Sequence, residues 1–230
     1  MVEVYLSKLT LSVQQRSTWR LLGDTYALHR FILQGFPEVS EGGCGRVLFR
    51  VDSGKGEAQL LVQSDKEPNW FKLPREVVTD IQGPKRWVLQ SSEGQLAFQV
   101  GQRLRFRLRA NPTYKKEGKR HAWLLRSQQA DWLARKGIQH GFSLSLIPSG
   151  EDWLNPFGEE DNESKYDVRI VPLDHLRGNK PSHEKSIEHF GVDFEGVLTV
   201  TDPVLFAEAL AAGIGAAKGF GFGLLSVARA

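Results

Sequence analysis

Arginine and apolar residues alternate strictly over residues 103–110, which read Arg-Leu-Arg-Phe-Arg-Leu-Arg-Ala. Successive side chains of a strand point to opposite faces, so this pattern predicts a strand with all four guanidinium groups on one face. The four apolar groups leave the opposite face. The chain must therefore contain a sheet that is covered on one side and polar on the other.

Strand and helix patterns divide the chain into two similar halves. In the first half, they predict strands at about 2–11, 46–51 and 59–64, a strand pair at 86–91 and 96–110, and a loop with short helical pieces at 65–86. Asp24 or Thr25 is a candidate N-cap for a helix over about 26–34. The polar residues 111–118 predict a linker.

The second half repeats the arrangement of the first. It predicts strands at 119–125, 139–147, 166–173 and 188–200, a helix over 127–136, and a helix from Asp202-Pro203 to about 212, followed by a glycine-rich loop and a final strand. Each half thus reads as a split βαβ unit. The sequence predicts an α+β fold of tandem ferredoxin-like (RRM-like) domains, 1–115 and 116–230, each an antiparallel sheet with helices on one face.

Bulk properties exclude several classes of protein. No run approaches the ~18 apolar residues that a membrane-spanning helix needs. Met1 leads directly into a strand pattern, so no secretory leader is expected. Cys44 is the single cysteine, which excludes an intrachain disulfide and fits a reducing compartment. These features predict a cytoplasmic protein without a membrane partner.

Positive charge is concentrated in one segment. Residues 101–120 carry a net charge of +7 in a chain whose net charge is +3. The segment contains the four alternating arginines, Arg103, Arg105, Arg107 and Arg109. A solvated sheet face is the alternative reading, but such a face usually mixes signs because stacked like charges repel. The pattern favours a track for the phosphates of a polyanion.

The C-terminal stretch 213–230 contains five glycines and Lys218. Glycine loops that bind mononucleotides run from strand to loop to helix, whereas here the helix comes first and the strand follows. This order argues against a nucleotide cofactor and leaves RNA as a ligand. Backbone N–H groups beside a lysine can cradle phosphate, so Lys218 and Gly219 are candidate RNA-binding residues.

Tyr26 and His29 are three residues apart, a spacing that puts both side chains on one face of a helix. Histidine is the side chain best suited to proton transfer near neutral pH, and a neighbouring tyrosine could orient or stabilise the reacting group. The pair suits RNA cleavage by an adjacent 2′-hydroxyl, which needs no metal. The alternative is a packed, hydrogen-bonded histidine at a helix start.

A basic tip between the last two long strands contains Arg177 and Lys180. It reads equally well as a hairpin that enters an RNA groove and as a solvated loop. None of the six histidines forms His-x-x-x-His, and a lone cysteine cannot make a thiolate cluster. No metal and no small-molecule cofactor are expected.

Together these motifs resemble the CRISPR-associated repeat-processing endoribonucleases of type I-E systems, the CasE family. The resemblance rests on four blocks that span nearly the whole chain: the N-terminal strand with Leu-Ser-Lys-Leu, the segment Tyr26-Ala-Leu-His-Arg30, the segment 101–112, and the stretch from Phe194-Glu-Gly through Thr201-Asp-Pro203 to Val227. Any one block is suggestive, and the four in this order are specific.

The resemblance implies two ferredoxin-like domains and metal-independent cleavage of precursor CRISPR RNA at the 3′ base of the repeat hairpin, leaving 5′-hydroxyl and 2′,3′-cyclic phosphate ends. It implies that the protein stays on the guide RNA as a subunit of the Cascade complex, with other Cascade subunits as partners. It makes Tyr26 and His29 the catalytic pair, and it places Arg30, Lys218 and the tip with Arg177 and Lys180 near RNA. The acidic segment 151–163 has no counterpart.

Two other functions are compatible with parts of the sequence. A non-catalytic RNA-binding subunit would keep the sheets and the glycine loop without the chemistry. A nucleotide-dependent enzyme would use the glycine loop, although the order of elements argues against it.

Overall fold

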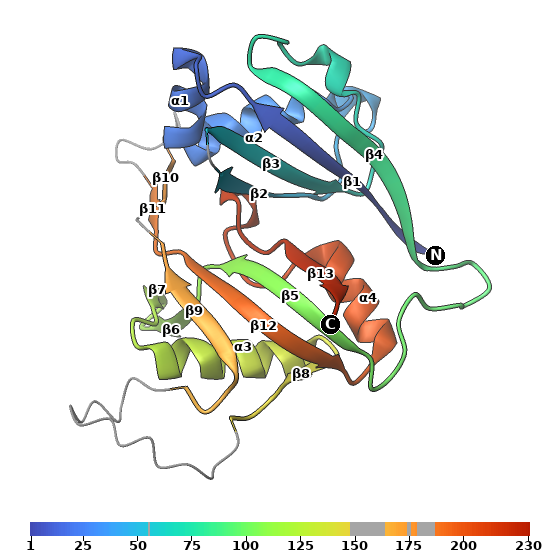
Figure 1. Cartoon of the computed structure of the whole chain (residues 1–230), viewed down its shortest axis with the longest axis vertical. Coiled ribbons are helices and arrows are strands. Elements are labelled where there is room, and N and C mark those ends of the chain that lie inside the picture. The colour runs from blue at the N-terminus through green and yellow to red at the C-terminus, as the bar shows by residue number, and fades with distance from the viewer. Residues whose placement is uncertain (55, 148–163, 174–175, 179–186) are drawn as a thin grey trace.

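A four-stranded and a five-stranded antiparallel sheet, one above the other, form the body of the protein in a computed structural model (Figure 1). The structure describes residues 1–54, 56–147, 164–173, 176–178 and 187–230. Lys180 and the acidic segment 151–163 lie outside the described residues. No helix in these ranges is long and apolar enough to span a membrane.

The first sheet has the strand order β2-β3-β1-β4. Its strands are β1 (Val2–Leu11), β2 (Val47–Gly54), β3 (Glu57–Ser64) and β4 (Val78–Gln90), and its helical segments are α1 (Arg16–Gly23), α2 (Thr25–Leu33), η1 (Val39–Glu41) and η2 (Trp70–Lys72). The predicted strands at 2–11, 46–51 and 59–64 are confirmed, and β4 begins well before the predicted position. The short helix α1 was not predicted: its one fully buried residue is Thr18, and no side chain caps its start.

The second sheet has the order β13-β5-β12-β8, and β9 also pairs with β12. Its strands are β5 (Arg103–Ala110), β8 (Phe142–Leu144), β9 (Val168–Pro172), β12 (Val192–Val200) and β13 (Leu225–Arg229), with helices α3 (Arg126–Gln139) and α4 (Pro203–Ala212) and the 3₁₀ turn η4 (Lys218–Phe220). Two small hairpins lie outside the two sheets. In one, β6 (Thr113–Lys116) pairs with β7 (Lys119–Ala122), and in the other, β10 (Leu176–Gly178) pairs with β11 (Ile187–His189).

The strand with the alternating arginines belongs to the second sheet. β5 pairs with β12 and β13, whereas β4 pairs with β1, so the predicted pairing of 86–91 with 96–110 is wrong apart from a single bridge between Gln90 and Leu96. The chain therefore passes from one sheet to the other between β4 and β5, ahead of the predicted boundary after residue 115. The predicted linker 111–118 is also wrong: it contributes β6 and the turn to β7.

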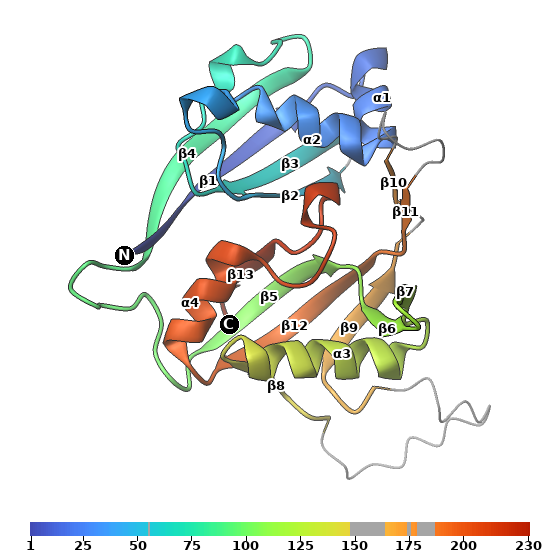
Figure 2. The same cartoon turned by 180° about the vertical axis from the view of Figure 1, so that it is seen from behind.

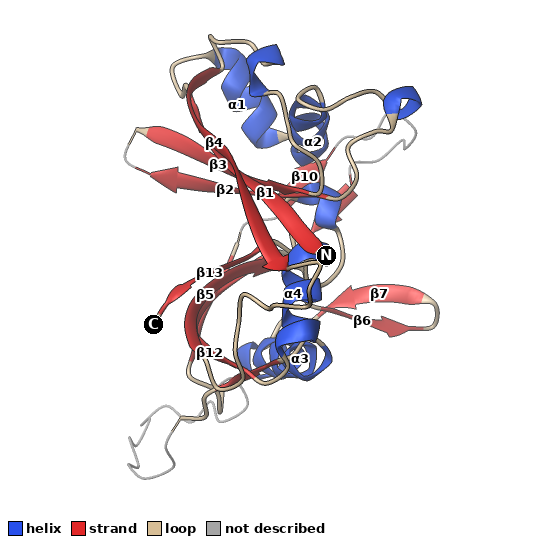
Figure 3. Cartoon of the chain, turned by 90° about the vertical axis from the view of Figure 1, so that its right-hand side faces the viewer, coloured by secondary structure: helices blue, strands red, loops and turns tan. Residues whose placement is uncertain are grey.

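Both sheets have the strand order of a ferredoxin-like fold. In the first sheet β1 lies between β3 and β4, and in the second sheet β5 lies between β12 and β13. Helices α2, α3 and α4 cover the same side of the two sheets, and β6–β7 projects on that side as well (Figures 2 and 3). The predicted α+β class with tandem ferredoxin-like units is thus confirmed. The two buried clusters lie between each sheet and its helices, around Leu28 and Ile32 in one unit and Phe206 and Leu210 in the other.

Local signals explain where the two important helices begin. The Asp24 carboxylate accepts hydrogen bonds from the N–H groups of Tyr26 and Ala27 at 3.0 and 3.1 Å, which caps α2. Asp202 caps α4 in the same way and is followed by Pro203 at the first helical position. Burial of Leu28, Phe31 and Ile32 then fixes the rotation of α2 and hence the direction of its other side chains.

Candidate functional site

His29 projects from α2 toward the second unit and is half-buried. Its ring stacks on Phe49 of β2, with centroids 5.9 Å apart and planes inclined by 17°. A Cβ atom built on Gly219 would lie 3.8 Å from His29 Nε2, so the glycine turn passes directly over the imidazole. The histidine therefore lies at the contact between the two units, with Nε2 directed at η4.

The second ring nitrogen of His29 has no hydrogen-bond partner among the described residues. Nδ1 is buried and forms no hydrogen bond with the described residues, so the protein does not fix the tautomer of this imidazole. Burial lowers the pKa of His29 below its ordinary value. The His29 imidazole is therefore predominantly neutral at pH 7. Its Nε2 can accept a proton in one tautomer and donate one in the other.

Glycine is required in the turn that covers His29. Gly221 and Gly223 have φ values of +83° and +90°, and a Cβ on Gly221 would lie 3.2 Å from the Phe49 ring. Ala217 also has a left-handed φ of 59°. The turn is closed by Ile214 N–H, which donates to the Gly223 carbonyl at 2.9 Å. The predicted glycine loop thus brings a tightly built backbone against α2 and β2.

The small hairpin β10–β11 joins the same site. A Cβ on Gly178 would lie 2.6 Å from Phe220 of η4 and 3.1 Å from Thr25 Oγ1 of α2, so this hairpin packs on both elements. At its other strand, the His189 ring lies 4.6 Å from the Phe220 ring. Arg177 precedes Gly178 in β10 and therefore belongs to the hairpin that contacts the glycine turn.

Tyr26 and Arg30 flank His29 on α2. Tyr26 is half-buried one turn before His29, as the spacing predicts. Arg30 is exposed and lines a separate hollow with Leu33, Phe36 and Cys44 beyond the end of the helix. The three predicted elements, α2, the glycine turn and the basic hairpin, are therefore brought together, although their sequences are far apart.

Lys218 faces a second hollow, next to the glycine turn. Its Nζ donates to the carbonyl of Ala212 at the end of α4, at 2.8 Å. Burial lowers the pKa of Lys218, and the nearby charges of Arg46 and Lys136 lower it further. The lysine thus has a structural contact that the sequence did not predict.

Basic side chains surround this second hollow, which has a volume of about 440 Å³. Its cationic lining residues come from β6–β7, α3 and the glycine loop, and they are Lys115, Arg120, Lys136 and Lys218. His140 and Tyr114 complete the wall. We call this feature the basic hollow. The sequence analysis did not select Lys136 or His140, because nothing in a helical pattern shows that α3 ends beside the glycine loop.

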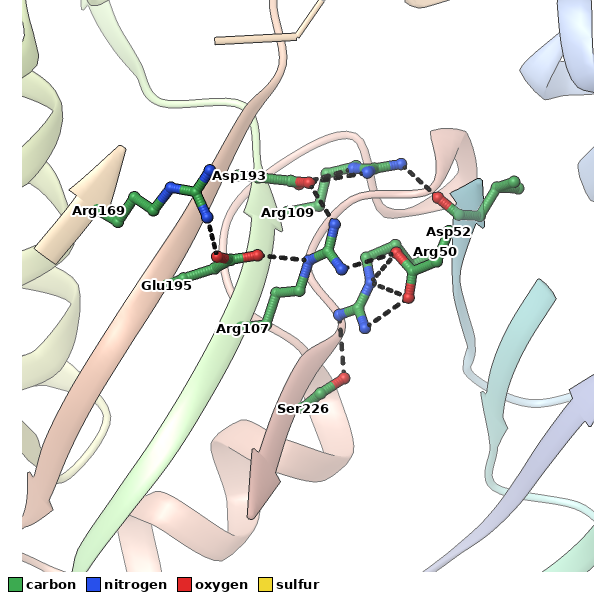
Figure 4. Close-up of polar contacts among 9 residues, drawn as sticks. Arg50, Asp52, Arg107, Arg109, Arg169, Asp193, Glu195 and Ser226 are labelled. Carbon is green, nitrogen blue, oxygen red and sulfur yellow. Dashed lines mark hydrogen bonds and ion pairs between the residues drawn. The ribbon is translucent and has the colours of Figure 1, made fainter. Parts of the chain in front are cut away.

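The arginine strand differs from its prediction in two of its four residues. Arg109 pairs with Asp193 of β12 at 2.8 Å, and Arg107 pairs with Asp193 at 2.9 Å and with Asp52 of β2 at 3.3 Å. Figure 4 shows these groups in one network that also includes Arg50 and Glu195. The acids come from other strands, so the segment 101–120 alone gave no sign of them.

Arg103 and Arg105 remain as predicted on the exposed face of β5. Within the described part of the chain, neither forms an ion pair. Two of the four arginines expected to form a phosphate track, Arg107 and Arg109, are therefore held in ion pairs.

Over the ranges that the structure describes, no three His, Cys, Asp or Glu side chains are grouped in a way that could hold a metal ion.

Comparison with known proteins gives full-length matches. A family model described as "CRISPR associated protein" matches residues 4–229. The CRISPR-associated endoribonuclease Cse3 of Thermus thermophilus is 32% identical over 98% of this chain and 100% of its own length. The CRISPR system Cascade subunit CasE of Escherichia coli is 28% identical over 98% of this chain and 99% of its own.

A solved structure agrees with these matches. The structure of Thermus thermophilus Cse3 bound to an RNA representing a pre-cleavage complex superposes with a TM-score of 0.77 and 31% identity, and the match covers 99% of this chain and 100% of the other. The similarity therefore includes both ferredoxin-like units and the elements that surround His29.

Proposed function

This chain belongs to the family of CRISPR associated proteins, of the CasE/Cse3 type, and we propose that it is a metal-independent endoribonuclease for precursor CRISPR RNA. Its substrate is the repeat hairpin, which it cuts at the 3′ base of the stem. The observation that carries this proposal is the position of His29 Nε2 against the glycine turn, with Tyr26 on the same helix. The likeness to a relative solved with a pre-cleavage RNA supports it.

The proposed reaction is attack by a 2′-hydroxyl on the adjacent phosphorus. The O2′–H proton passes to Nε2 of neutral His29 as the O2′–P bond forms, and the P–O5′ bond breaks. The departing O5′ takes up a proton, which leaves a 5′-hydroxyl on one fragment and a 2′,3′-cyclic phosphate on the other. The lowered pKa of His29 supports the role of base, because the imidazole is unprotonated near neutral pH.

Two other groups serve the reaction in this proposal. The Tyr26 hydroxyl orients the reacting groups or donates to a phosphate oxygen. The backbone of η4 approaches His29 without a side chain at Gly219, which leaves room for a phosphodiester between the turn and the imidazole. Charge that develops on the phosphoryl oxygens is then stabilised by positioned donors.

The RNA stem has a basic path away from this centre. The basic hollow adjoins the glycine turn, and β6–β7 presents Lys115, Lys116, Lys119 and Arg120 beyond it. Arg30 and Arg177 are proposed to contact RNA on the other side of His29, and Lys180, which lies outside the described residues, is proposed to contact RNA as well. Several phosphate contacts give affinity that depends strongly on salt, which fits retention of the product. The chain would then remain on the guide RNA as a Cascade subunit, as the name of the Escherichia coli relative indicates for that protein.

A 5′-labelled repeat hairpin tests the proposal on a denaturing gel in the presence of EDTA. Wild-type protein should cut it once, and His29→Gln should bind it with unchanged affinity but cut it ~100-fold or more slowly, since a positioned acid or base contributes 10²–10⁴-fold. The matched substrate carries a 2′-deoxy nucleotide at the cut site and should stay intact. Cutting of the deoxy substrate, or loss of wild-type cutting in EDTA, would contradict the mechanism. An intact natural substrate that binds would favour the non-catalytic RNA-binding subunit.

A further inference from the structure

Arg109 makes side-chain contacts with both ferredoxin-like units. Its Nε and Nη2 donate to the two carboxylate oxygens of Asp193 on β12, at 2.8 and 2.9 Å. Its Nη1 donates at 2.9 Å to the carbonyl of Val51 on β2, an edge strand of the first sheet. One planar guanidinium thus joins the second sheet to a backbone atom of the first.

The backbone of Arg109 holds a third element. Its carbonyl accepts a hydrogen bond of 2.8 Å from the N–H of Gly223, the last glycine of the loop that contains η4. Arg109 is therefore fixed at once to β12, to β2 and to the end of the glycine turn. Among the described residues of the network in Figure 4, it is Arg109 whose backbone is hydrogen-bonded to the glycine loop.

These contacts lead to His29 along a short route. Val51 is two residues from Phe49 on β2, and Phe49 carries the stacked ring of His29 on one side. Gly221, two residues before Gly223, approaches the same Phe49 ring. The position of β2 relative to the glycine loop therefore sets the position of His29 relative to Gly219.

We propose that Arg109 is a positioning residue, which fixes the glycine turn against His29 by tying Val51, Asp193 and Gly223 together. The inference rests on the proposed function only for its effect on cleavage. Arg109 does not touch the reacting atoms in this view. It holds two elements, each from a different unit, at the separation that the reaction needs.

The planar geometry of the guanidinium group explains why position 109 is an arginine. A guanidinium donates in its plane from several nitrogens at fixed angles, so it can satisfy a carboxylate with one edge and a carbonyl with another. The ammonium of a lysine is a compact point charge on a flexible stem. Lysine at this position keeps the ion pair with Asp193 but cannot hold the Val51 carbonyl in the same geometry.

Arg109→Lys in the full-length protein tests the inference, with Arg103→Lys as the matched control. Arg103 lies on the same face of the same strand, is exposed, and forms no ion pair within the described ranges. The first readout is the NMR titration of the His29 imidazole, assigned with His29→Gln. Loosening of the glycine turn admits water, so the pKa of His29, which burial lowers, should rise toward its ordinary value in Arg109→Lys and stay unchanged in Arg103→Lys.

The second readout is single-turnover cleavage of the repeat hairpin at saturating protein. Arg109→Lys should cut roughly 10- to 100-fold more slowly with RNA affinity changed less than about twofold, because a displacement of about 1 Å can cost this much. Melting curves confirm that both variants are folded. If Arg109→Lys is too unstable at the assay temperature, both readouts are taken at a lower temperature at which its melting curve shows it folded.

The two readouts separate this inference from the proposed function. An unchanged His29 titration in Arg109→Lys overturns the inference, whatever the cleavage rate. A raised pKa with wild-type cleavage overturns the claim that this placement matters to the reaction. If the wild-type protein does not cut RNA at all, the proposed function fails, and the titration alone still decides whether Arg109 holds the turn against His29.

Discussion

The ring of His29 lies over the ring of Phe49, with centroids 5.9 Å apart and planes inclined by 17°. Phe49 is fully buried on β2, so the histidine is supported by the core of the first unit while its Nε2 faces the turn of the second. This arrangement removes water from one face of the imidazole. It also makes the separation of the two units a determinant of the space above Nε2.

The pH dependence of cleavage should report the buried imidazole. Burial lowers the pKa of His29 below its ordinary value, so the unprotonated base predominates at pH 7 and is lost as pH falls through that lowered value. The single-turnover rate at subsaturating protein should fall about tenfold per pH unit below it. The residual rate of His29→Gln should not fall in this way at low pH. A rate that instead falls as pH rises would assign His29 the role of acid.

Gly219 and Gly221 should respond differently to alanine. Gly219 does not have a positive φ, and its added Cβ would lie 3.8 Å from His29 Nε2, in ordinary contact. Gly219→Ala should therefore fold normally but fill the space proposed for the phosphodiester, lowering the cleavage rate roughly tenfold or more. Melting curves measure the stability of the variant, binding titrations measure its RNA affinity, and single-turnover assays measure its cleavage rate.

Gly221→Ala is the matched comparison within the same turn. Its φ of +83° is unfavourable for alanine, and its Cβ would lie 3.2 Å from Phe49. We expect a loss of about 1–3 kcal/mol in the free energy of unfolding. Equal stability of the two variants would contradict the strained geometry of the turn.

Much of this site could be predicted from local signals. Asp24 and Asp202 each precede an apolar helical pattern, and both cap the helices that the sequence predicts. The i, i+3 spacing put Tyr26 and His29 on one helix, and the glycine content predicted the turn. Each of these signals lies within a few residues of the feature that it predicts.

The features that were missed depend on contacts between distant segments. The acids that neutralise Arg107 and Arg109, Asp52 and Asp193, lie on other strands and are invisible within 101–120. β5 looked like the last strand of the first unit because register and partner choice are not encoded in alternation. The strand β6 is a short polar segment that resembles a linker, whereas β7 falls within the strand predicted at 119–125.

Lys218→Ala should affect both RNA binding and stability. Loss of one phosphate contact should weaken repeat-RNA binding and reduce the slope of log affinity against log salt by about 1. Loss of the hydrogen bond to the Ala212 carbonyl should also cost about 0.5–1.5 kcal/mol of folding free energy.

A control on the opposite unit separates these effects. Lys85→Ala removes the same charge from an exposed position on β4 and should change neither the slope nor the stability appreciably. Salt titrations of RNA binding and chemical denaturation measure the two effects. An unchanged salt slope in Lys218→Ala would show that this lysine has only its structural contact with the end of α4.

Asp193→Asn should destabilise the contact between the units, most strongly at neutral pH. Burial opposes ionisation of Asp193, but hydrogen bonds and charge from Arg109 and Arg107 prevail and lower its pKa. A carboxyl whose folded pKa lies below its unfolded value adds stability above the unfolded pKa, and this stability is lost as pH falls through the folded pKa. Removal of one partner from a buried pair costs roughly 3 kcal/mol or more.

Denaturant unfolding at a series of pH values checks this prediction. The wild-type free energy of unfolding should exceed that of Asp193→Asn at pH 7. The difference should begin to shrink as pH falls below the ordinary aspartate pKa of 3.8 and should vanish only below the lowered pKa of folded Asp193. Glu195→Gln is the matched control, because Glu195 pairs with Arg107 and Arg169 but is 34% exposed. Exposed ion pairs contribute little, so its loss should be below about 1 kcal/mol. A Glu195→Gln loss as large as that of Asp193→Asn would mean that the number of ion pairs, and not the burial of Asp193 beneath Arg109, sets the strength of the contact.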